Sequence, residues 1–399
     1  MFEVNNFSIA RLPRIMFGAG VFKELPAIAA RYGRRALLVT GGKSLRASTN
    51  WRTLEDGLRA AGMTWEAMTV ETEPSPQLVD EAVAAFRFKR IEVVIGIGGG
   101  SVLDAAKAIA GLLIPGNSVM DHLEGVGREI PYAGPATPFI AVPTTAGTGS
   151  EATKNAVLSV QGANGYKKSF RDDRLVAQVA VVDPELLAGC PPEIMAANGM
   201  DAFTQLLESY VSMKANPFTD ALAVSGMEAV REGFFAAWKG GDGAEARRGR
   251  TCMSYAAHLS GITLAQAGLG SVHGLASPLG AFFPIPHGVV CGTILAVATE
   301  VNLRALRERA PDSPALEKYA RIGALLSDEP PRDREEALST LVEKLAEWTE
   351  RLNLRRLGDY GVTENHVAKL VANARGSSMK TNPVLLTDAE IAEIARRRL

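Results

Sequence analysis

Histidine and cysteine are scarce in this sequence, and neither positive nor negative charge is in excess. Each of these features excludes a class of protein. Only 5 of the 399 residues are histidine and 3 are cysteine. The cysteines, Cys190, Cys252 and Cys291, lie far apart and form no Cys-x-x-Cys pair. This spacing excludes a disulfide framework and a cysteine-rich zinc motif, so we expect reduced cysteines in the core of a cytoplasmic protein.

The charges are balanced and the apolar runs are short. The 43 lysines and arginines nearly match the 44 aspartates and glutamates, which gives a formal net charge of −1 and a pI near 6.6. Without a basic surplus, nucleic acid and anionic membranes are excluded as main partners. Glycine or charge interrupts each apolar run before about 18 residues, so we expect no membrane span. Residues 1–9 also lack the pattern of a secretory signal.

The length and the residue patterns predict two domains, since a single core rarely grows to this size. Up to about residue 190, strand and helix patterns alternate, which predicts an α/β domain with a parallel, doubly wound sheet. The expected strands are 35–40, 64–70, 91–97 and 138–142, and the expected helices are 49–61, 77–89 and 102–112. Residues 191–399 predict a helical domain, with helices at 202–212, 219–239, 244–259, 314–326, 334–352, 363–374 and 388–398. A capping box of Thr387 and Glu390 begins the last helix.

A glycine-rich turn follows the strand at 91–97. Gly98, Gly99 and Gly100 precede Ser101 at the start of a helix. Glycines at a strand-to-helix turn let backbone N–H groups approach a phosphate, and the helix N-terminus adds partial positive charge. The turn therefore predicts a phosphate-binding site, and the alternative is a tight turn without a ligand.

A second polar loop follows the strand at 138–142. It contains Thr144, Thr145, Thr148 and two glycines. In a doubly wound sheet both loops emerge at the carboxyl edge, where ligands bind. The alternative is that this loop is a Ser/Thr-rich connection without a ligand. The two loops together predict a bound nucleotide.

Four polar residues in the second half form an incomplete-looking metal site. Asp201 and Gln205 are spaced to share one face of a helix, whereas His273 and His287 lie in segments broken by glycine and proline, which we predict to be loops. One carboxylate and two imidazoles, with or without an amide oxygen, can hold a catalytic divalent metal. The alternative is two loop histidines that bind no metal.

The sequence resembles the iron-containing (group III) alcohol dehydrogenases along nearly its whole length. The matching segments, in order, are Phe17-Gly18-Ala19-Gly20, Gly98-Gly99-Gly100-Ser101-x-x-Asp104-x-x-Lys107, the loop 143–151, Asp183-Pro184, Gly199-Met200-Asp201-Ala202, Glu208-x-Tyr210-x-Ser212, Gly270-x-x-His273-Gly274, Pro286-His287-Gly288 and Asn382-Pro383. The resemblance implies a dehydroquinate synthase-like architecture, with NAD(P) between a nucleotide-binding domain and an all-α domain that holds Fe or Zn. It also implies oxidation of an alcohol, or reduction of an aldehyde or ketone, and a homo-oligomer of two or more subunits.

The resemblance assigns roles to individual residues. For the nucleotide it implies Gly99, Gly100, Ser101, Thr144, Thr145, Thr148 and Lys167. For the metal it implies Asp201, His273 and His287, while Gln205 stands where the family has a further histidine. Ser277 replaces a histidine that many members use near the substrate, so we expect Ser277, a ribose hydroxyl or water to carry the proton. Gln205 itself could ligate the metal, donate to a ligand or contact the substrate, and Lys167 (or its neighbour Lys168) could instead be solvated.

The turn after the first predicted strand bears on the choice of nucleotide. NAD-preferring members often have an aspartate where this chain has Gly41, and a carboxylate there repels a 2′-phosphate. The change to Gly41, followed by Gly42, Lys43 and Ser44, suits a 2′-phosphate by charge and hydrogen bonding. We therefore favour NADP(H) over NAD(H), although the two glycines could simply shape the turn.

We predict reversible hydride transfer between the nicotinamide and a small carbonyl substrate in an apolar pocket. The pocket residues expected from the sequence are Phe203, Leu206, Leu269, Phe282 and Phe283. We expect Glu208 and Asp104 to be structural. Alternatives are a dehydroquinate synthase-like lyase, which would need more lysine and arginine near these motifs, a glycerol dehydrogenase-like zinc enzyme, and a metal-free nucleotide-binding relative.

Overall fold

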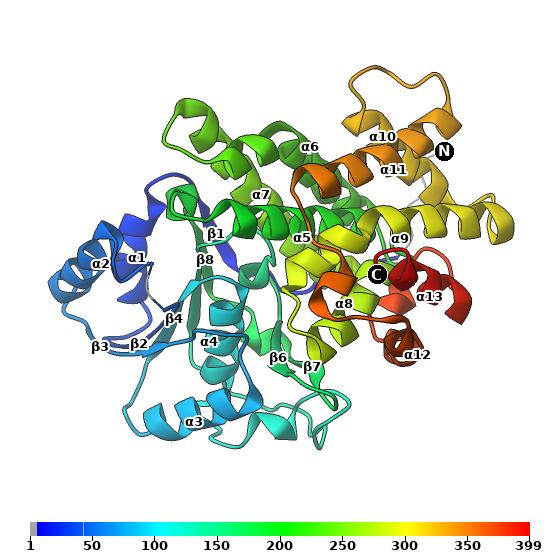
Figure 1. Cartoon of the computed structure of the whole chain (residues 1–399). Helices are drawn as coiled ribbons and strands as arrows, with labels where there is room; N and C mark the ends of the chain where they lie inside the picture. Colours follow the sequence, from blue (N-terminus) through cyan, green and yellow to red (C-terminus); the bar gives the residue numbers. More distant parts are fainter. Residues whose placement is uncertain (1–5, 43) are drawn as a thin grey trace.

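A parallel sheet forms the centre of the first half of the chain. The computed structural model describes residues 6–42 and 44–399, and within these residues six strands pair in the order β1-β8-β5-β4-β2-β3 (Figure 1). The strands are β1 (Arg14–Phe17), β2 (Arg35–Thr40), β3 (Thr64–Thr69), β4 (Val93–Gly98), β5 (Phe139–Pro143) and β8 (Val179–Val182). The central strands β4 and β5 are buried along their whole length, as expected for a sheet covered on both faces.

Helices cover the two faces of this sheet with separate apolar cores. Leu37 and Val39 of β2 pack in the core that includes residues of α3 (Pro76–Phe86) and α4 (Gly100–Leu112). Leu38 points to the opposite face, where the core includes residues of α1 (Leu25–Ala29) and α2 (Thr49–Ala60). Because alternate residues of a strand face opposite sides, one continuous apolar run supplies both cores. The predicted doubly wound α/β sheet is thus confirmed.

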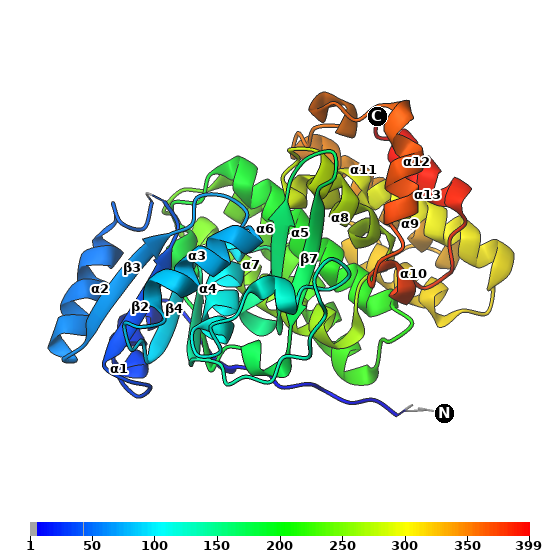
Figure 2. The ribbon, with the colours of Figure 1, turned by 90° about the horizontal axis from the view of Figure 1, so that it is seen from below.

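An antiparallel hairpin, which the sequence patterns did not predict, packs against the second half of the chain. It consists of β6 (Asn155–Val160) and β7 (Tyr166–Arg171), paired from Asn155↔Arg171 to Val160↔Tyr166. Figure 2 shows β7 beside α8 (Ser271–Phe282), and the backbone N–H of Gly162 donates to the carbonyl of Ala281 over 3.1 Å. The hairpin therefore brings polar residues of the first half against the helices of the second.

The second half of the chain is helical, as predicted. Its helices are α5 (Pro192–Val211), α6 (Pro217–Lys239), α7 (Ala244–Ala267), α8, α9 (His287–Arg309), α10 (Pro314–Leu326), α11 (Arg334–Arg351), α12 (Glu364–Asn373) and α13 (Asp388–Arg396). Short 3-10 helices are η1 (Val21–Glu24), η2 (Val119–Asp121), η3 (Ser150–Ala152), η4 (Asp173–Leu175), η5 (Pro184–Leu187), η6 (Leu357–Tyr360) and η7 (Met379–Thr381). The capping box that begins α13 is confirmed, since the Glu390 N–H donates to Thr387 Oγ1 and the Thr387 N–H to Glu390 Oε2.

The prediction that His273 and His287 lie in loops is wrong. His273 lies in the first turn of α8, and His287 is the first residue of α9. Gly270 and Pro286, which suggested loops, are the N-cap residues of these two helices. Both helices are buried on nearly all sides, so neither shows the amphipathic period by which a surface helix is recognised.

Among the described residues, α9 is the one helix long and apolar enough to cross a membrane by length and composition alone. Its most apolar 18-residue window has a mean hydropathy of 1.5. However, 78% of that window is buried inside the protein. We therefore assign α9 as a central helix of the helical core.

Candidate active site

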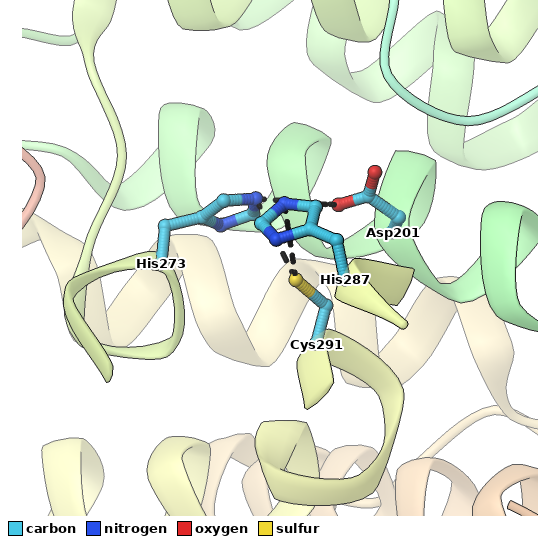
Figure 3. A group of neighbouring side chains, drawn as sticks. All are labelled: Asp201, His273, His287 and Cys291. Carbon is cyan, nitrogen blue, oxygen red and sulfur yellow. Dashed lines mark hydrogen bonds and ion pairs between the residues drawn. The ribbon is translucent and has the colours of Figure 1, made fainter. Parts of the chain in front are cut away.

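Four side chains from three buried helices place ligand atoms around a common point (Figure 3). Asp201 comes from α5, His273 from α8, and His287 and Cys291 from consecutive turns of α9. One ligand atom from each residue lies within 4.8 Å of the other three. Helix positions four residues apart share a face, which is why His287 and Cys291 point to the same spot.

The interatomic distances in this cluster are short. His273 Nε2 lies 3.3 Å from Asp201 Oδ1, and His287 Nε2 lies 3.6 Å from the same oxygen. The Sγ atom of Cys291 lies 3.7 Å from His273 Nε2 and 3.8 Å from His287 Nε2. The donor set of carboxylate, imidazole and thiol fits a divalent transition metal, because these are the groups that bind zinc in proteins.

Burial and mutual charge set the protonation of these groups. Burial raises the pKa of Asp201, but the two histidines outweigh it and leave the pKa lowered, so this carboxylate is ionised. Burial lowers the pKa of His287 to about 4, which leaves a neutral imidazole with a free lone pair. Burial raises the pKa of Cys291 to about 12, so its thiol loses the proton only when a cation takes the proton's place.

Glu208 holds His273 in the orientation that a metal ligand requires. Its Oε2 lies 2.7 Å from His273 Nδ1, and its Oε1 accepts from the Val272 N–H over 2.7 Å. A ligating histidine commonly donates its second ring N–H to a carboxylate, which leaves the other nitrogen free for the metal. The sequence analysis gave Glu208 only a structural role. Its position seven residues after Asp201, on the same helix face, was the signal that could have found it.

Gln205 lies one turn after Asp201 but its amide oxygen is engaged elsewhere. Ser260 Oγ on α7 donates to Gln205 Oε1 over 2.7 Å. The side chain is buried, with 3% of its residue surface exposed, and it lines the same cavity as the metal-ligand cluster. Gln205 is therefore near the cluster, with its oxygen already accepting a hydrogen bond.

One cavity of about 1480 Å³ connects this cluster with the predicted phosphate loops. The predicted site residues that line it are Gly99, Gly100, Ser101, Thr145, Thr148, Lys167, Asp201, Gln205, His273, Ser277 and His287. Within the described part of the chain, four others do not line it: Gly41, Gly42, Ser44 and Thr144. Lys43, part of the cofactor argument, lies outside the described residues.

The glycines of the first loop let the N-terminus of α4 pack closely against the second loop. A Cβ atom on Gly100 would lie 2.6 Å from Thr148 Cγ2, and one on Gly99 would lie 3.2 Å from Thr145 Oγ1. Gly99 is the N-cap of α4 and has no side chain to satisfy the first N–H groups of the helix. These N–H groups therefore stay available for an anion, as the helix N-terminus prefers.

Lys167 lies on β7, lines the cavity and forms an ion pair with Glu73. Its Nζ lies 2.6 Å from Glu73 Oε1, and 12% of the lysine side chain is exposed. Burial raises the pKa of Glu73, but the charge of Lys167 outweighs it and leaves the pKa lowered. Ser277 Oγ on α8 donates to the Lys167 carbonyl over 3.2 Å. The alternative of a freely solvated Lys167 is therefore wrong.

The predicted apolar pocket is largely wrong. Phe203 and Leu206 are fully buried on α5, where the Phe203 ring packs edge-on against Trp348 at 5.2 Å. The Phe283 ring packs against His366 at 5.0 Å. Of the five predicted residues, Leu269 lines the cavity and the other four do not. A helix residue faces the site or the core according to its position in the turn, which the composition of a segment does not reveal.

Comparison with known proteins covers both halves of the chain. Residues 13–184 match the family model of iron-containing alcohol dehydrogenase, and residues 195–399 match the C-terminal model of the same family. The chain belongs to the iron-containing alcohol dehydrogenase family. The recognition from sequence motifs is thereby confirmed.

Relatives of this dehydrogenase match it over its full length. It is 33% identical to alcohol dehydrogenase 4 of Saccharomyces cerevisiae, covering 100% of this chain and 99% of the relative. It is 32% identical to long-chain-alcohol dehydrogenase 1 of Geobacillus thermodenitrificans, covering 97% and 96%. Among solved structures, an archaeal halo-thermophilic alcohol dehydrogenase from a Red Sea brine pool superposes with a TM-score of 0.89, at 28% identity and full coverage of both chains.

The dehydrogenase is a metal-dependent, NAD(P)-linked enzyme that acts on alcohols. Its cofactors are a nicotinamide nucleotide and a divalent metal such as iron, and the cluster on α5, α8 and α9 supplies a possible site for that metal. The oxidoreductase assignment also decides against the dehydroquinate synthase-like lyase that the fold class left open.

Proposed function

We propose that the enzyme interconverts an alcohol and its aldehyde or ketone inside the cavity of about 1480 Å³, with residues 1–190 binding the nucleotide and 191–399 holding metal and substrate. One observation carries this proposal: the N-terminus of α4 lines the same cavity as Asp201, His273 and His287 of the ligand cluster. Hydride transfer needs the nicotinamide and the carbonyl carbon in contact, and a shared cavity permits that contact.

We assign the pyrophosphate of the nucleotide to Gly99, Gly100 and Ser101, where free backbone N–H groups begin α4. Thr145 and Thr148, packed beside these glycines, add hydroxyl donors to the lining of the cavity. Thr144 and Lys167 are assigned to the phosphates and ribose on the family resemblance. Lys167 pairs with Glu73, and the phosphate of a nucleotide would compete for this cation.

The metal is assigned to Asp201, His273 and His287, whose ligand atoms meet at one point. When bound, it supplies Lewis-acid polarisation of the substrate oxygen. Glu208 keeps the Nδ1–H tautomer of His273, so that Nε2 faces the cluster. Ser277 lines the cavity with a hydroxyl that can hold a proton and pass it on. Asp201 is 1% exposed, so the surrounding helices exclude water from it.

We favour NADP(H) as the nucleotide, with Gly41, Gly42 and Ser44 as the residues near its ribose. Gly41 directly follows β2 and places no carboxylate at this position. A Cβ atom added to Gly41 would lie 3.9 Å from Val102 Cγ2 at the start of α4. Against this preference, Glu71 lies beside Gly42, since its Oε1 would be 3.7 Å from a Cβ atom added there. A Gly41→Asp variant tests the choice: kcat/KM for NADPH should fall about tenfold or more, while NADH is unaffected. Equal losses for both nucleotides would contradict it.

The substrate is proposed to be a small alcohol with an apolar chain, since Leu264, Leu269 and Leu354 line the cavity beside polar groups. The name of the Geobacillus relative, a long-chain-alcohol dehydrogenase, is in line with this class. We further propose a cytoplasmic homodimer. The edge strand β1 leaves Ile15 43% and Phe17 37% exposed, and an apolar strand edge is a common site of association.

Activity of the metal-loaded enzyme tests the assignment. We expect consumption of NADPH with straight-chain aldehydes, and a loss of at least about 100-fold in kcat for Asp201→Asn, since metal polarisation is worth several kcal/mol. Asp242→Asn, at an exposed aspartate between α6 and α7, is the matched control and should behave as wild type. Consumption of neither NADPH nor NADH by metal-loaded wild type would refute the function.

A further inference from the structure

Cys291 is the one member of the ligand cluster that the sequence analysis did not connect with metal. It is fully buried, one turn after His287 on α9, and its sulfur faces the cluster (Figure 3). Sγ lies at nearly equal distances, 3.7 and 3.8 Å, from Nε2 of His273 and of His287. A thiol has a single proton, so as a hydrogen-bond partner it would donate to one imidazole and accept from the other. Such a pair of hydrogen bonds accounts for the two sulfur distances but leaves the 3.6 Å between His287 Nε2 and Asp201 Oδ1 without an explanation.

Coordination geometry does explain it. For tetrahedral zinc, with Zn–N of about 2.0–2.1 Å and Zn–S of about 2.3 Å, neighbouring N and O ligands should be about 3.3 Å apart and N and S ligands about 3.6 Å apart. The imidazole nitrogens lie 3.3 and 3.6 Å from Asp201 Oδ1, and the sulfur lies 3.7 and 3.8 Å from the two nitrogens. Four of the six distances among these atoms are thus close to those of ligands on one ion, and the other two are no longer than 4.8 Å.

Gln205 competes poorly with Cys291 for the same role. Its Oε1 already accepts a hydrogen bond of 2.7 Å from Ser260 Oγ. Ligation by Gln205 would have to share or break that bond, whereas Cys291 needs no rearrangement. A neutral amide oxygen is also a weaker ligand for zinc than a thiolate.

We propose that Cys291, as its thiolate, is the fourth protein ligand of the divalent metal, and that Gln205 lies outside the ligand set. On metal binding the S–H bond breaks, the S–metal bond forms and the proton leaves to solvent. A thiolate among two imidazoles and a carboxylate favours Zn(II) over Fe(II), because zinc binds more tightly than iron to such ligands. This inference rests on the proposed metal site and names one more of its ligands, so the substrate oxygen would have to bind as a fifth ligand.

Cobalt(II) is the probe for the test, since a thiolate bound to cobalt gives a charge-transfer band in the near ultraviolet. Metal-free wild type, Cys291→Ser, Gln205→Ala and the control Cys252→Ser are titrated with cobalt(II). Cys252 is a half-buried cysteine on α7 that packs against Gly233 of α6. We expect the band in wild type, Gln205→Ala and Cys252→Ser, and its loss in Cys291→Ser. Zn(II) affinity should fall at least about 100-fold in Cys291→Ser, beyond the loss typical of removing a group behind a ligand.

Zinc-loaded wild type gives a second measurement that needs no variant. Its X-ray absorption fine structure should contain one sulfur at about 2.3 Å beside N and O ligands at about 2.0–2.1 Å. Cobalt or zinc binding without any sulfur signal would overturn the assignment of Cys291 and leave the proposed dehydrogenase intact. A band that disappears in Gln205→Ala but persists in Cys291→Ser would also overturn it. Binding of neither metal to wild type would refute the metal site itself, and with it this inference.

Discussion

Replacing Glu208 with glutamine removes a negative charge behind the metal-ligand cluster with almost no change in volume. In the wild type, one carboxylate oxygen accepts a hydrogen bond from the Val272 N–H, and the other lies 2.7 Å from His273 Nδ1. A glutamine has one acceptor oxygen for these two donors. One of the two N–H groups must therefore face an NH₂ group, unless the His273 ring changes tautomer.

The expected loss of Zn(II) affinity depends on how the new amide pairs with the His273 ring. If the amide NH₂ faces Nδ1, the proton moves to Nε2, the atom that points at Asp201 and Cys291. If the amide oxygen faces Nδ1, the buried Val272 N–H loses its partner. Loss of a carboxylate behind a ligating histidine typically costs 10–100-fold in metal affinity, or about 1.4–2.7 kcal/mol. We expect Glu208→Gln to bind Zn(II) more weakly by that factor.

Competition with a chromophoric chelator near neutral pH measures the Zn(II) affinity directly. Glu343→Gln, at an exposed glutamate on α11, is the matched control and should bind as wild type does. Circular dichroism and thermal unfolding of the metal-free proteins separate a local effect from a loss of fold. An unchanged Zn(II) affinity in folded Glu208→Gln would refute the assignment of His273 as a ligand held by Glu208.

Three further predictions concern the rest of the molecule. Gly100→Ala places a methyl group against Thr148, so nucleotide affinity measured by fluorescence titration should fall and stability should drop by about 1–3 kcal/mol; unchanged binding would contradict the role of the loop. Lys107→Met removes a fully buried cation from the carboxylate of Asp104, whose side chain is 13% exposed, and should cost about 3–5 kcal/mol in urea unfolding, whereas a loss below about 1 kcal/mol would contradict a stabilising role of this ion pair. Burial raises the pKa of Glu390, but its bonds to Arg309 and Thr387 leave it lowered, so its stabilisation is present above the unfolded pKa of about 4.3 and lost as pH falls through the folded pKa. Glu390→Gln should therefore destabilise by about 1 kcal/mol at pH near 7 and by progressively less as the pH falls through the folded pKa of Glu390, and an effect that does not change with pH would count against this.

Local signals in the sequence were sufficient for much of the fold. β2 (Arg35–Thr40) coincides with the predicted strand, because a fully buried parallel strand is a continuous apolar run bounded by turn residues. The surface helices α10 and α11 were also found, since each has a polar face and an apolar face. The short strands of the hairpin β6–β7 were missed because residues such as Lys167 and Lys168 gave that segment no clear apolar run.

The ligand cluster was only partly predictable. Asp201, His273 and His287 were found because their motifs have unusual residue types at fixed spacing. Cys291 was assigned to the core because a buried cysteine resembles any small apolar residue in sequence, and its spacing of four from His287 has meaning only if both lie on a helix. Since Pro286 suggested a loop, that helix was not expected, and Cys291 was therefore not recognised as a member of the cluster.

The charge of the cluster gives an independent reason to expect a cation there. Asp201 is ionised and almost completely buried on α5, and its nearest partners are two imidazoles, of which His287 is neutral. His273 shares its proton with a second buried carboxylate, that of Glu208. Two acidic side chains, Asp201 and Glu208, thus have only imidazoles as their basic partners in this cluster, and buried negative charge is costly unless it is balanced. A divalent cation at the point where the four ligand atoms meet would balance that charge, so the same burial that destabilises the metal-free site favours tight metal binding.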